Sequence, residues 1–167
     1  LVSMAIGEEL VISDRGKSDY SIIIAVDASV QDSYAAQMLK RYIREMSGAD
    51  LAIVLDTAPL SENEIIVGFN RHSKKFGADE PRDDFGQEEF RIQTIGSYVI
   101  IVGGSPRGVL YGVNSLLIDE WGCRWFSPSV KHIPKHERLT LKATDRRYEP
   151  PFEWRDVYFW SGLDNEW

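Results

Sequence analysis

Short apolar runs, separated by polar or glycine-containing turns, recur along the chain and predict a series of β-strands. Around residue 90, Phe90, Ile92 and Thr94 alternate with polar neighbours, the pattern of a strand with one buried face. The run 21–26 is continuously apolar and rich in β-branched residues, so we expect it to be a central strand. The predicted strands span residues 9–13, 21–26, 51–55, 64–68, 90–94, 98–102 and 139–141.

Apolar residues at helical spacing predict two helices. The first begins after Ser29, a favourable N-cap, and ends at Gly48. The second begins after Ser105, has Pro106 at its first position, and ends at Gly122. The first apolar stripe comprises Val30, Tyr34, Ala35, Met38, Leu39, Tyr42, Ile43 and Met46, and the second comprises Val109, Leu110, Val113, Leu116, Leu117 and Trp121.

The order of these elements predicts the fold class. A strand, a helix and another strand at the spacing of residues 21–55 indicate a right-handed crossover between parallel strands. The later strands 90–94 and 98–102 are joined by a tight turn at residues 95–97. We therefore expect an α/β (α+β) fold in which a mixed β-sheet is packed with two amphipathic helices.

Composition shifts near the C-terminus predict a domain boundary. We expect an α/β domain over residues 1–145, followed by a linker and a first strand of a further domain over 146–167. Pro150 and Pro151 disfavour regular structure, and the segment 152–160 then becomes aromatic and β-prone. The chain also begins at Leu1 without an initiator methionine or a signal-peptide pattern, so we expect a removed targeting segment or a shortened chain.

Length, charge and cysteine content exclude several classes of protein. The 167 residues suffice for one domain with its own core, and no apolar run is long enough to span a membrane. The net charge of −7 argues against a nucleic-acid-binding face. The single cysteine, Cys123, excludes an internal disulfide and is expected to be a packed thiol.

The glycine-containing turn before the second helix resembles a phosphate-binding loop only in its setting. Gly103 and Gly104 follow a buried strand, but the spacing of a dinucleotide or P-loop motif is missing and Pro106 removes a backbone donor. We expect a structural turn. The adjacent carboxylates at 88–89 and 119–120 diverge within each pair, so neither predicts the facing acids of a glycosidase.

Metal binding and other cofactors are not predicted. His132 and His136 are four residues apart, but Pro134 between them forbids an ordinary helix that could present both to zinc. The acidic segment within 70–87 lacks the spacing of a calcium loop, and we expect a solvated surface loop there. We predict no catalytic residues, no metal and no cofactor.

The five tryptophans all lie in the last third of the chain and leave two interpretations open. Aromatic rings stack on sugar rings, but tryptophans near a domain junction also form the core of an interface. Trp125 and Trp154 are the candidates for contacts with a sugar.

Several motifs resemble the small α/β domain that precedes the catalytic barrel in bacterial α-glucuronidases and in family 20 β-N-acetylhexosaminidases. In those domains an E-x-(Y/F)-x-(I/L) segment leads into an apolar strand, a glycine turn and a helix beginning R-G-x-x-Y-G. An earlier helix of the type A-A-x-x-L-x-x-Y-(I/L) ends in M-(S/T)-G-A. The matching segments here are 88–92, 99–102, 107–112 and 116–117 for the first pattern, 35–43 and 46–49 for the second, and 122–126 and 151–156, which resemble large bacterial proteins of this architecture.

The resemblance covers roughly residues 21–156 and implies a hexosaminidase domain-2-like fold without catalytic residues of its own. In the family the barrel begins at a motif like Phe-x-x-Arg, whose arginine binds sugar hydroxyls in family 20. Arg155 occupies the matching position, so the resemblance implies a substrate-binding role for it. It also implies a downstream barrel domain of the same chain as partner, an oligo- or polysaccharide as ligand, and export to the periplasm or outside the cell.

The predicted function is therefore that of a non-catalytic N-terminal accessory domain of a glycoside hydrolase, which packs against the catalytic barrel and is inactive alone. The alternative is a carbohydrate-binding module that uses exposed tryptophans. A third possibility is a protein-interaction domain that buries the aromatic C-terminal segment. No nucleic acid or membrane span is expected in any of the three.

Overall fold

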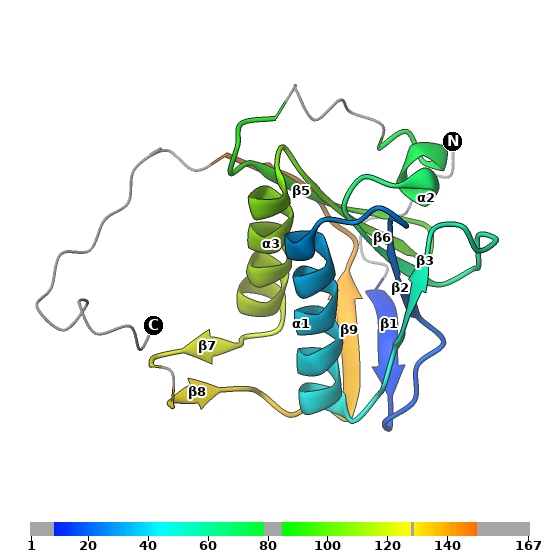
Figure 1. The fold of residues 1–167 in the computed structure, drawn as a ribbon. Helices are drawn as coiled ribbons and strands as arrows, with labels where there is room; N and C mark the ends of the chain where they lie inside the picture. The colour runs from blue at the N-terminus through cyan, green and yellow to red at the C-terminus, as the bar shows by residue number, and fades with distance from the viewer. Residues whose placement is uncertain (1–8, 79–84, 128, 150–167) are drawn as a thin grey trace, which may run out of the picture.

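The computed structural model describes residues 9–78, 85–127 and 129–149. A six-stranded mixed sheet forms the centre of the fold, and the helices α1 (Val30–Ser47) and α3 (Pro106–Ser115) lie side by side on one of its faces (Figure 1). The predicted fold class, a mixed sheet covered by two amphipathic helices, is confirmed. No helix among the described residues is long and apolar enough to cross a membrane.

The strands of the main sheet run in the order β10-β5-β6-β4-β2-β3. The pairs β2–β3, β2–β4 and β4–β6 are parallel, and β5 pairs antiparallel with both β6 and β10. The run predicted to be central does lie inside the sheet, as β2. The bounds are β2 (Ser21–Ile24), β3 (Ala52–Leu55), β4 (Glu64–Val67), β5 (Phe90–Ile95), β6 (Tyr98–Gly103) and β10 (Asp145–Tyr148).

Local capping explains where the two long helices begin. The Ser29 side chain accepts a hydrogen bond from the Asp32 amide at the start of α1, and Gly48 ends that helix with a φ of 81°. The Ser105 side chain caps α3, with Pro106 in its first turn. The second predicted helix does not continue unchanged to Gly122, because its last turn is the π-helical segment η2 (Leu116–Glu120).

The first two turns of α1 differ from the prediction. Val30 and Tyr34 were expected in the buried stripe, but they are 82% and 53% exposed. The residues that contact the sheet lie on another side of the helix, which includes Ala35, Leu39 and Ile43. One flank of α1 therefore carries exposed apolar side chains.

Both faces of the main sheet are packed. The larger core lies between the sheet and the helices α1 and α3. A smaller core covers the opposite face and contains Ile23, Ile66 and Ile100 together with Ala78 and Phe85. This explains why β2, β4 and β6 are continuously apolar rather than alternating.

Two small antiparallel sheets complete the fold. β1 (Glu9–Asp14) pairs with β9 (Arg138–Lys142), and both contribute leucine or isoleucine side chains to the larger core. β7 (Arg124–Trp125) pairs with β8 (Lys131–His132) in a hairpin that follows η2. Strands near the two ends of the described chain are therefore joined by hydrogen bonds.

The predicted linker does not begin at residue 146. Asp145–Tyr148 forms the edge strand β10, and Arg146 extends from it to the Ser115 hydroxyl and the carboxylates of Asp119 and Glu120. An edge strand needs few apolar residues when its side chains find polar partners on neighbouring elements. The aromatic segment 152–160 lies outside the described residues.

The predicted solvated loop over residues 70–87 is also only partly correct. Its first part folds into the short helix α2 (Arg71–Lys75), which Asn70 caps and whose His72 and Ser73 are buried. Phe85 is buried as well. The acidic residues 79–84 lie outside the described part of the chain.

Candidate functional site

Sheets with parallel strands usually bind ligands at the carboxyl ends of two neighbouring strands whose connections leave in opposite directions. Here those strands are β2 and β4. The connection from β2 forms α1 on one face of the sheet, whereas the connection from β4 forms α2 and the segment that packs on the opposite face. The loops after β2 and β4 are thus the first place to look for a site.

Buried side chains of the protein itself fill this place. The Asp56 carboxylate, which follows β3, accepts hydrogen bonds from the Val26 amide after β2 and from the Arg71 amide after β4, both at 3.0 Å. Asp32, in the first turn of α1, accepts a hydrogen bond from the Ser29 hydroxyl at 2.8 Å and lies against Gly68. The carboxylates hold the loops together where a ligand would otherwise enter.

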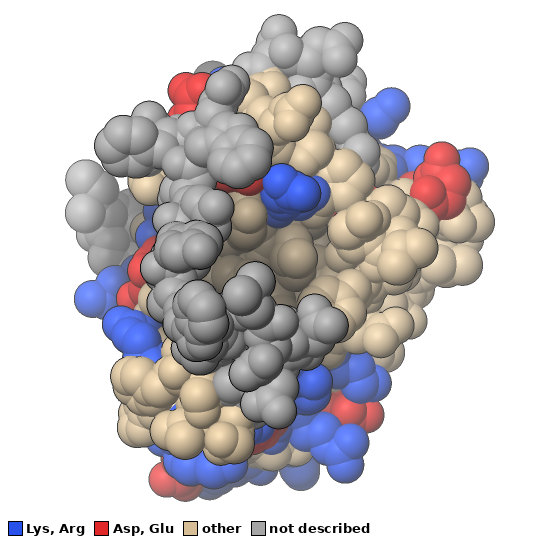
Figure 2. Space-filling model, turned by 60° about the vertical axis from the view of Figure 1, so that its left-hand side comes forward, with Lys and Arg blue, Asp and Glu red and all other residues tan. Residues whose placement is uncertain are grey.

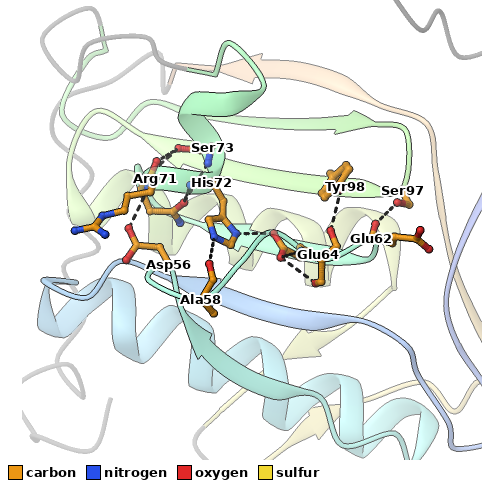
Figure 3. A network of polar contacts seen from close by, with 11 residues as sticks. Asp56, Ala58, Glu62, Glu64, Arg71, His72, Ser73, Ser97 and Tyr98 are labelled. Atoms are coloured by element: carbon orange, nitrogen blue, oxygen red, sulfur yellow. Dashed lines mark hydrogen bonds and ion pairs between the residues drawn. The ribbon is translucent and has the colours of Figure 1, made fainter.

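A second polar network connects α2 to β4 (Figure 3). The Nδ1 of His72 lies 2.8 Å from Oε2 of Glu64, and its Nε2 lies 3.0 Å from the carbonyl oxygen of Ala58. The other oxygen of Glu64 accepts hydrogen bonds from the amide and hydroxyl of Ser61 at 2.7 and 2.9 Å. Tyr98 donates to the Ser61 carbonyl, which fastens the same loop to β6.

The His72–Glu64 pair consists of the residue types of a catalytic acid–base pair, but a substrate cannot reach it. Both side chains are 1% exposed, and every nitrogen or oxygen of the two groups already has a protein partner. A catalytic acid or base must come within hydrogen-bond distance of its substrate. The pair therefore fixes α2 and the loop 56–64 against the sheet.

The glycine turn is confirmed as structural. A Cβ atom at Gly104 would lie 2.3 Å from the Gly86 carbonyl oxygen, and one at Gly108 would lie 2.3 Å from the Glu89 carbonyl oxygen. At Gly112 it would lie 2.8 Å from the Ile101 side chain. These glycines let α3 approach β5 and β6 closely, so the R-G-x-x-Y-G motif encodes helix–sheet packing.

Glu89 joins the same region to the edge strand. Its side chain accepts hydrogen bonds from Arg147 of β10 and from the Gly86 amide. The hydrogen bond from Arg147 lowers the pKa of Glu89, and burial opposes this shift only in part. The lowered pKa means that the pair stabilises the folded chain at neutral pH and that this contribution is lost as the pH falls through that value.

Trp125 is the only predicted sugar-contacting tryptophan among the described residues. Its indole Nε1 donates to the Tyr42 hydroxyl at 2.8 Å, and the two rings pack edge to face with centroids 5.0 Å apart. Lys131 lies over the other ring, Tyr42. The arrangement fastens the β7–β8 hairpin to α1, and a role of Trp125 in sugar binding stays a prediction.

Replacing Trp125 by phenylalanine is expected to lower the free energy of unfolding by about 1 kcal/mol, since a phenyl ring keeps most of the packing but cannot donate to Tyr42. Urea unfolding of the variant and the parent chain measures this difference. Phe126→Leu serves as the control, because Phe126 is 64% exposed in the same hairpin and its loss should change little. Equal stability of Trp125→Phe and the parent chain would contradict the fastening role.

Of the remaining predicted positions, some lie outside the described residues and one lies within them. Trp154 and Arg155 lie outside the described residues, so their predicted contacts with sugar stay predictions. Cys123 is a buried free thiol whose pKa is raised by burial, as expected for a packed cysteine. Within the described ranges no cluster of three or more His, Cys, Asp or Glu side chains could hold a metal ion.

The partnership between Glu64 and His72 was not predicted from the sequence. One signal was present: Glu64 opens an otherwise apolar strand that is buried on both faces, and a carboxylate in that setting requires a buried partner. The identity of the partner depends on where α2 folds, which the local pattern does not specify.

Comparison with known proteins gives both a family and a fold. The family model for the glycosyl hydrolase family 67 N-terminus matches residues 12–116. No curated protein sequence matches the chain. Among solved structures, the family GH115 4-O-methyl-α-glucuronidase BtGH115A, with specificity for decorated arabinogalactans, is similar with a TM-score of 0.62 and 16% identity over 85% of this chain.

Two family GH20 enzymes are also similar, with slightly lower TM-scores. The β-N-acetylhexosaminidase from Streptomyces coelicolor has a TM-score of 0.58, and the N-acetyl-β-hexosaminidase from Streptomyces plicatus has 0.56, each with 17% identity over 89% of this chain. The chain spans 19% of the GH115 enzyme and 25% of each GH20 enzyme. At this identity the likeness shows the fold.

Proposed function

The chain belongs to the glycosyl hydrolase family 67 N-terminus family, and we propose that it packs against the catalytic barrel of a larger glycoside hydrolase without catalysing the reaction itself. The single observation that carries this proposal is an apolar surface beside the point where the described chain ends. In this proposal the catalytic barrel follows this domain in the larger protein, and the barrel binds the carbohydrate substrate.

The surface, which we call the α3 face, consists of the outward side of α3 with η2 and the tip of the β7–β8 hairpin. Figure 2 brings this side of the molecule forward and shows a broad area of uncharged residues, hollowed at its centre, with Lys and Arg gathered near its lower edge. Exposed apolar side chains that cluster on one face are typical of a contact with a partner. The residues of the α3 face are the half-buried Leu110, Tyr111, Asn114 and Ile118 and the exposed Phe126 and Val130.

The last described strand leads the chain to this face. β10 is the edge strand on the side of α3, and Arg146 fixes it to α3 and η2. Tyr148 at the end of β10 packs on Phe90 with ring centroids 5.6 Å apart and remains exposed. A domain that follows Tyr148 would therefore start next to the α3 face, because the contacts of Arg146 and Tyr148 hold β10 in place.

Asp56 and Asp32, which occupy the loops after β2 and β4, and the buried His72–Glu64 pair support an accessory role. The polar groups that resemble catalytic ones among the described residues serve internal hydrogen bonds. Transition-state stabilisation requires groups that reach the reacting atoms, and these groups do not reach the surface. Export of the parent protein is part of the proposal, since polysaccharides are degraded outside the cytoplasm.

Two measurements test the proposal. The pure chain should show no turnover of aryl glycosides of uronic acids or hexosamines, and robust cleavage would refute the accessory role. In the full-length parent protein, Ile118→Asp should lower the free energy of unfolding by about 1 to 3 kcal/mol more than it does in the isolated chain, because a carboxylate then enters the interface with the barrel.

Val30→Asp is the matched control, since Val30 is an exposed apolar residue on the other helix. It should change the stability of the parent protein and of the isolated chain by the same small amount. If Ile118→Asp also behaves identically in the two proteins, the α3 face does not contact the barrel.

A further inference from the structure

We propose that the outer edge of β3 binds an extended, acidic segment of another polypeptide chain, which adds a strand to the sheet. β3 is the last strand in the sheet order, at the edge opposite β10, and no described strand pairs with its outer side. Its sequence, Ala-Ile-Val-Leu, has neither the lysine nor the proline that usually protects an open edge. The site is separate from the α3 face, so neither proposal depends on the other.

The backbone of β3 offers hydrogen-bonding groups in the alternation that a further strand requires. The Asp56 amide donates to the Ile24 carbonyl of β2 at 2.9 Å, so the amides of Ala52 and Val54 also face β2. The amides of Ile53 and Leu55 consequently face away from the sheet. The Ile53 carbonyl faces the same way, whereas the Leu55 carbonyl accepts a hydrogen bond from the Ala58 amide.

Exposed apolar side chains gather at one end of this edge. Leu55 ends β3, Val26 follows the neighbouring β2, and Val30 and Tyr34 lie in the first turns of α1, which begins after the short loop 27–29. These four make up half of the eight large exposed apolar residues in the described part of the chain. Strand addition takes its affinity from main-chain hydrogen bonds and its specificity from contacts with such side chains.

A groove along α1 supplies the charge preference. It has a volume of about 350 Å³ and is lined by Tyr34, Gln37, Met38, Lys40, Arg41, Arg44 and Asp50. Asp50 lies two residues before β3 in the sequence, so one end of the groove is near the start of this strand. The carboxylate of Asp50 lies 3.4 Å from Lys40 and 4.0 Å from Arg44, which leaves three cations against one anion.

The geometry of a β-strand connects the edge with the groove. Alternate side chains of an added strand point to opposite faces of the sheet, so every second one points to the α1 side, where the groove lies. Acidic side chains there meet Lys40, Arg41 and Arg44, and apolar ones meet Leu55 and Tyr34. A second copy of this chain fits less well, because its own β3, Ala-Ile-Val-Leu, has no acidic side chain to meet these cations and the following Asp56 is buried in internal hydrogen bonds.

The test uses the uniformly labelled full chain and a synthetic nine-residue peptide of alternating valine and glutamate. We expect the peptide to shift the amide resonances of Ile53 and Leu55 and to slow their hydrogen exchange, because both amides become hydrogen-bonded. A peptide with lysine in place of glutamate should bind more weakly. A peptide whose alternate amides are N-methylated has no hydrogen-bond donors along one edge, so it should bind more weakly than the unmodified peptide.

Charge variants test the groove. The double variant Lys40→Gln/Arg44→Gln should weaken binding of the glutamate peptide about five-fold, since two exposed charge pairs are removed. The matched control is Arg15→Gln/Arg138→Gln, which removes two exposed cations that do not line the groove and should leave binding unchanged. Unshifted Ile53 and Leu55 amides at millimolar peptide, or equal binding of the lysine peptide, overturns the proposal. Protection of these amides that depends on protein concentration without peptide also overturns it, in favour of a second copy.

Discussion

Replacing His72 by alanine is expected to lower the free energy of unfolding by about 3 to 5 kcal/mol, because the buried Glu64 carboxylate loses its ring partner. The two hydrogen bonds from Ser61 remain, but both reach Oε1 of Glu64, so Oε2 loses the partner that His72 provided. The stability of a domain of this size is only about 5 to 15 kcal/mol, so a loss of this size is readily measured. Urea unfolding followed by circular dichroism gives the difference.

A double-mutant cycle separates the effect of losing the His72–Glu64 interaction from the effect of the cavity that alanine leaves. Glu64→Leu/His72→Leu should be more stable than either single leucine variant, since no buried polar group is left without a partner. His132→Ala is the matched control, because His132 is exposed in β8 and its replacement should change stability little. Additive single effects would mean that the two side chains do not act as a unit.

The second large effect is expected at Gly108, where alanine should destabilise the chain by about 3 kcal/mol. Glycine to alanine inside a helix normally stabilises by about 1 kcal/mol, so the expected sign is reversed. The reason is the Glu89 carbonyl oxygen, which would lie 2.3 Å from the new methyl group. The backbone of Glu89, directly before β5, cannot rotate away as a side chain could, so α3 would have to move away from the sheet.

Asn114→Ala provides the comparison within the same helix. Asn114 lies on the outward side of α3, so alanine there should change stability by no more than about 0.5 kcal/mol. Thermal unfolding of both variants compares the two positions directly. If Gly108→Ala is as stable as Asn114→Ala, the close approach of α3 to β5 is not needed for folding.

The sequence predicted the central architecture because several local signals agreed there. The apolar runs that became β2, β4 and β6, the capping residues Ser29 and Ser105, and the terminating Gly48 each specify the same element boundaries. Parallel pairing followed from the length of the crossover through α1. The glycine turn after β6 was also interpreted correctly as structural.

The elements that were missed are held by partners distant in the sequence. β10 is largely polar, and its side chains are satisfied by Ser115, Asp119 and Glu89 rather than by an apolar core. α2 is five residues long and depends on the buried pair between His72 and Glu64. A short segment without its own apolar period gives no local signal of this kind.

The candidate site was predictable only in outline. The expectation of no catalytic group rested on missing motifs, whereas the structure shows how Asp56 and Asp32 occupy the loops after β2 and β4. No sequence pattern links Asp56 to the amides of Val26 and Arg71, because each lies on a different loop. Trp125 was predicted as a candidate for sugar contact, but its hydrogen bond to Tyr42 depends on where the β7–β8 hairpin packs against α1.

The pairing of β1 with β9 has a consequence for synthesis on the ribosome. Glu9 pairs with Lys142, so β1 leaves the ribosome long before β9 has been synthesised. Until then Leu10 and Ile12 lack their packing partners in the core. The edge strand β10 emerges later still. Contacts between such distant segments form slowly. This domain therefore completes its fold only as the residues beyond Tyr148 are being made, which couples its maturation in time to that of whatever follows it.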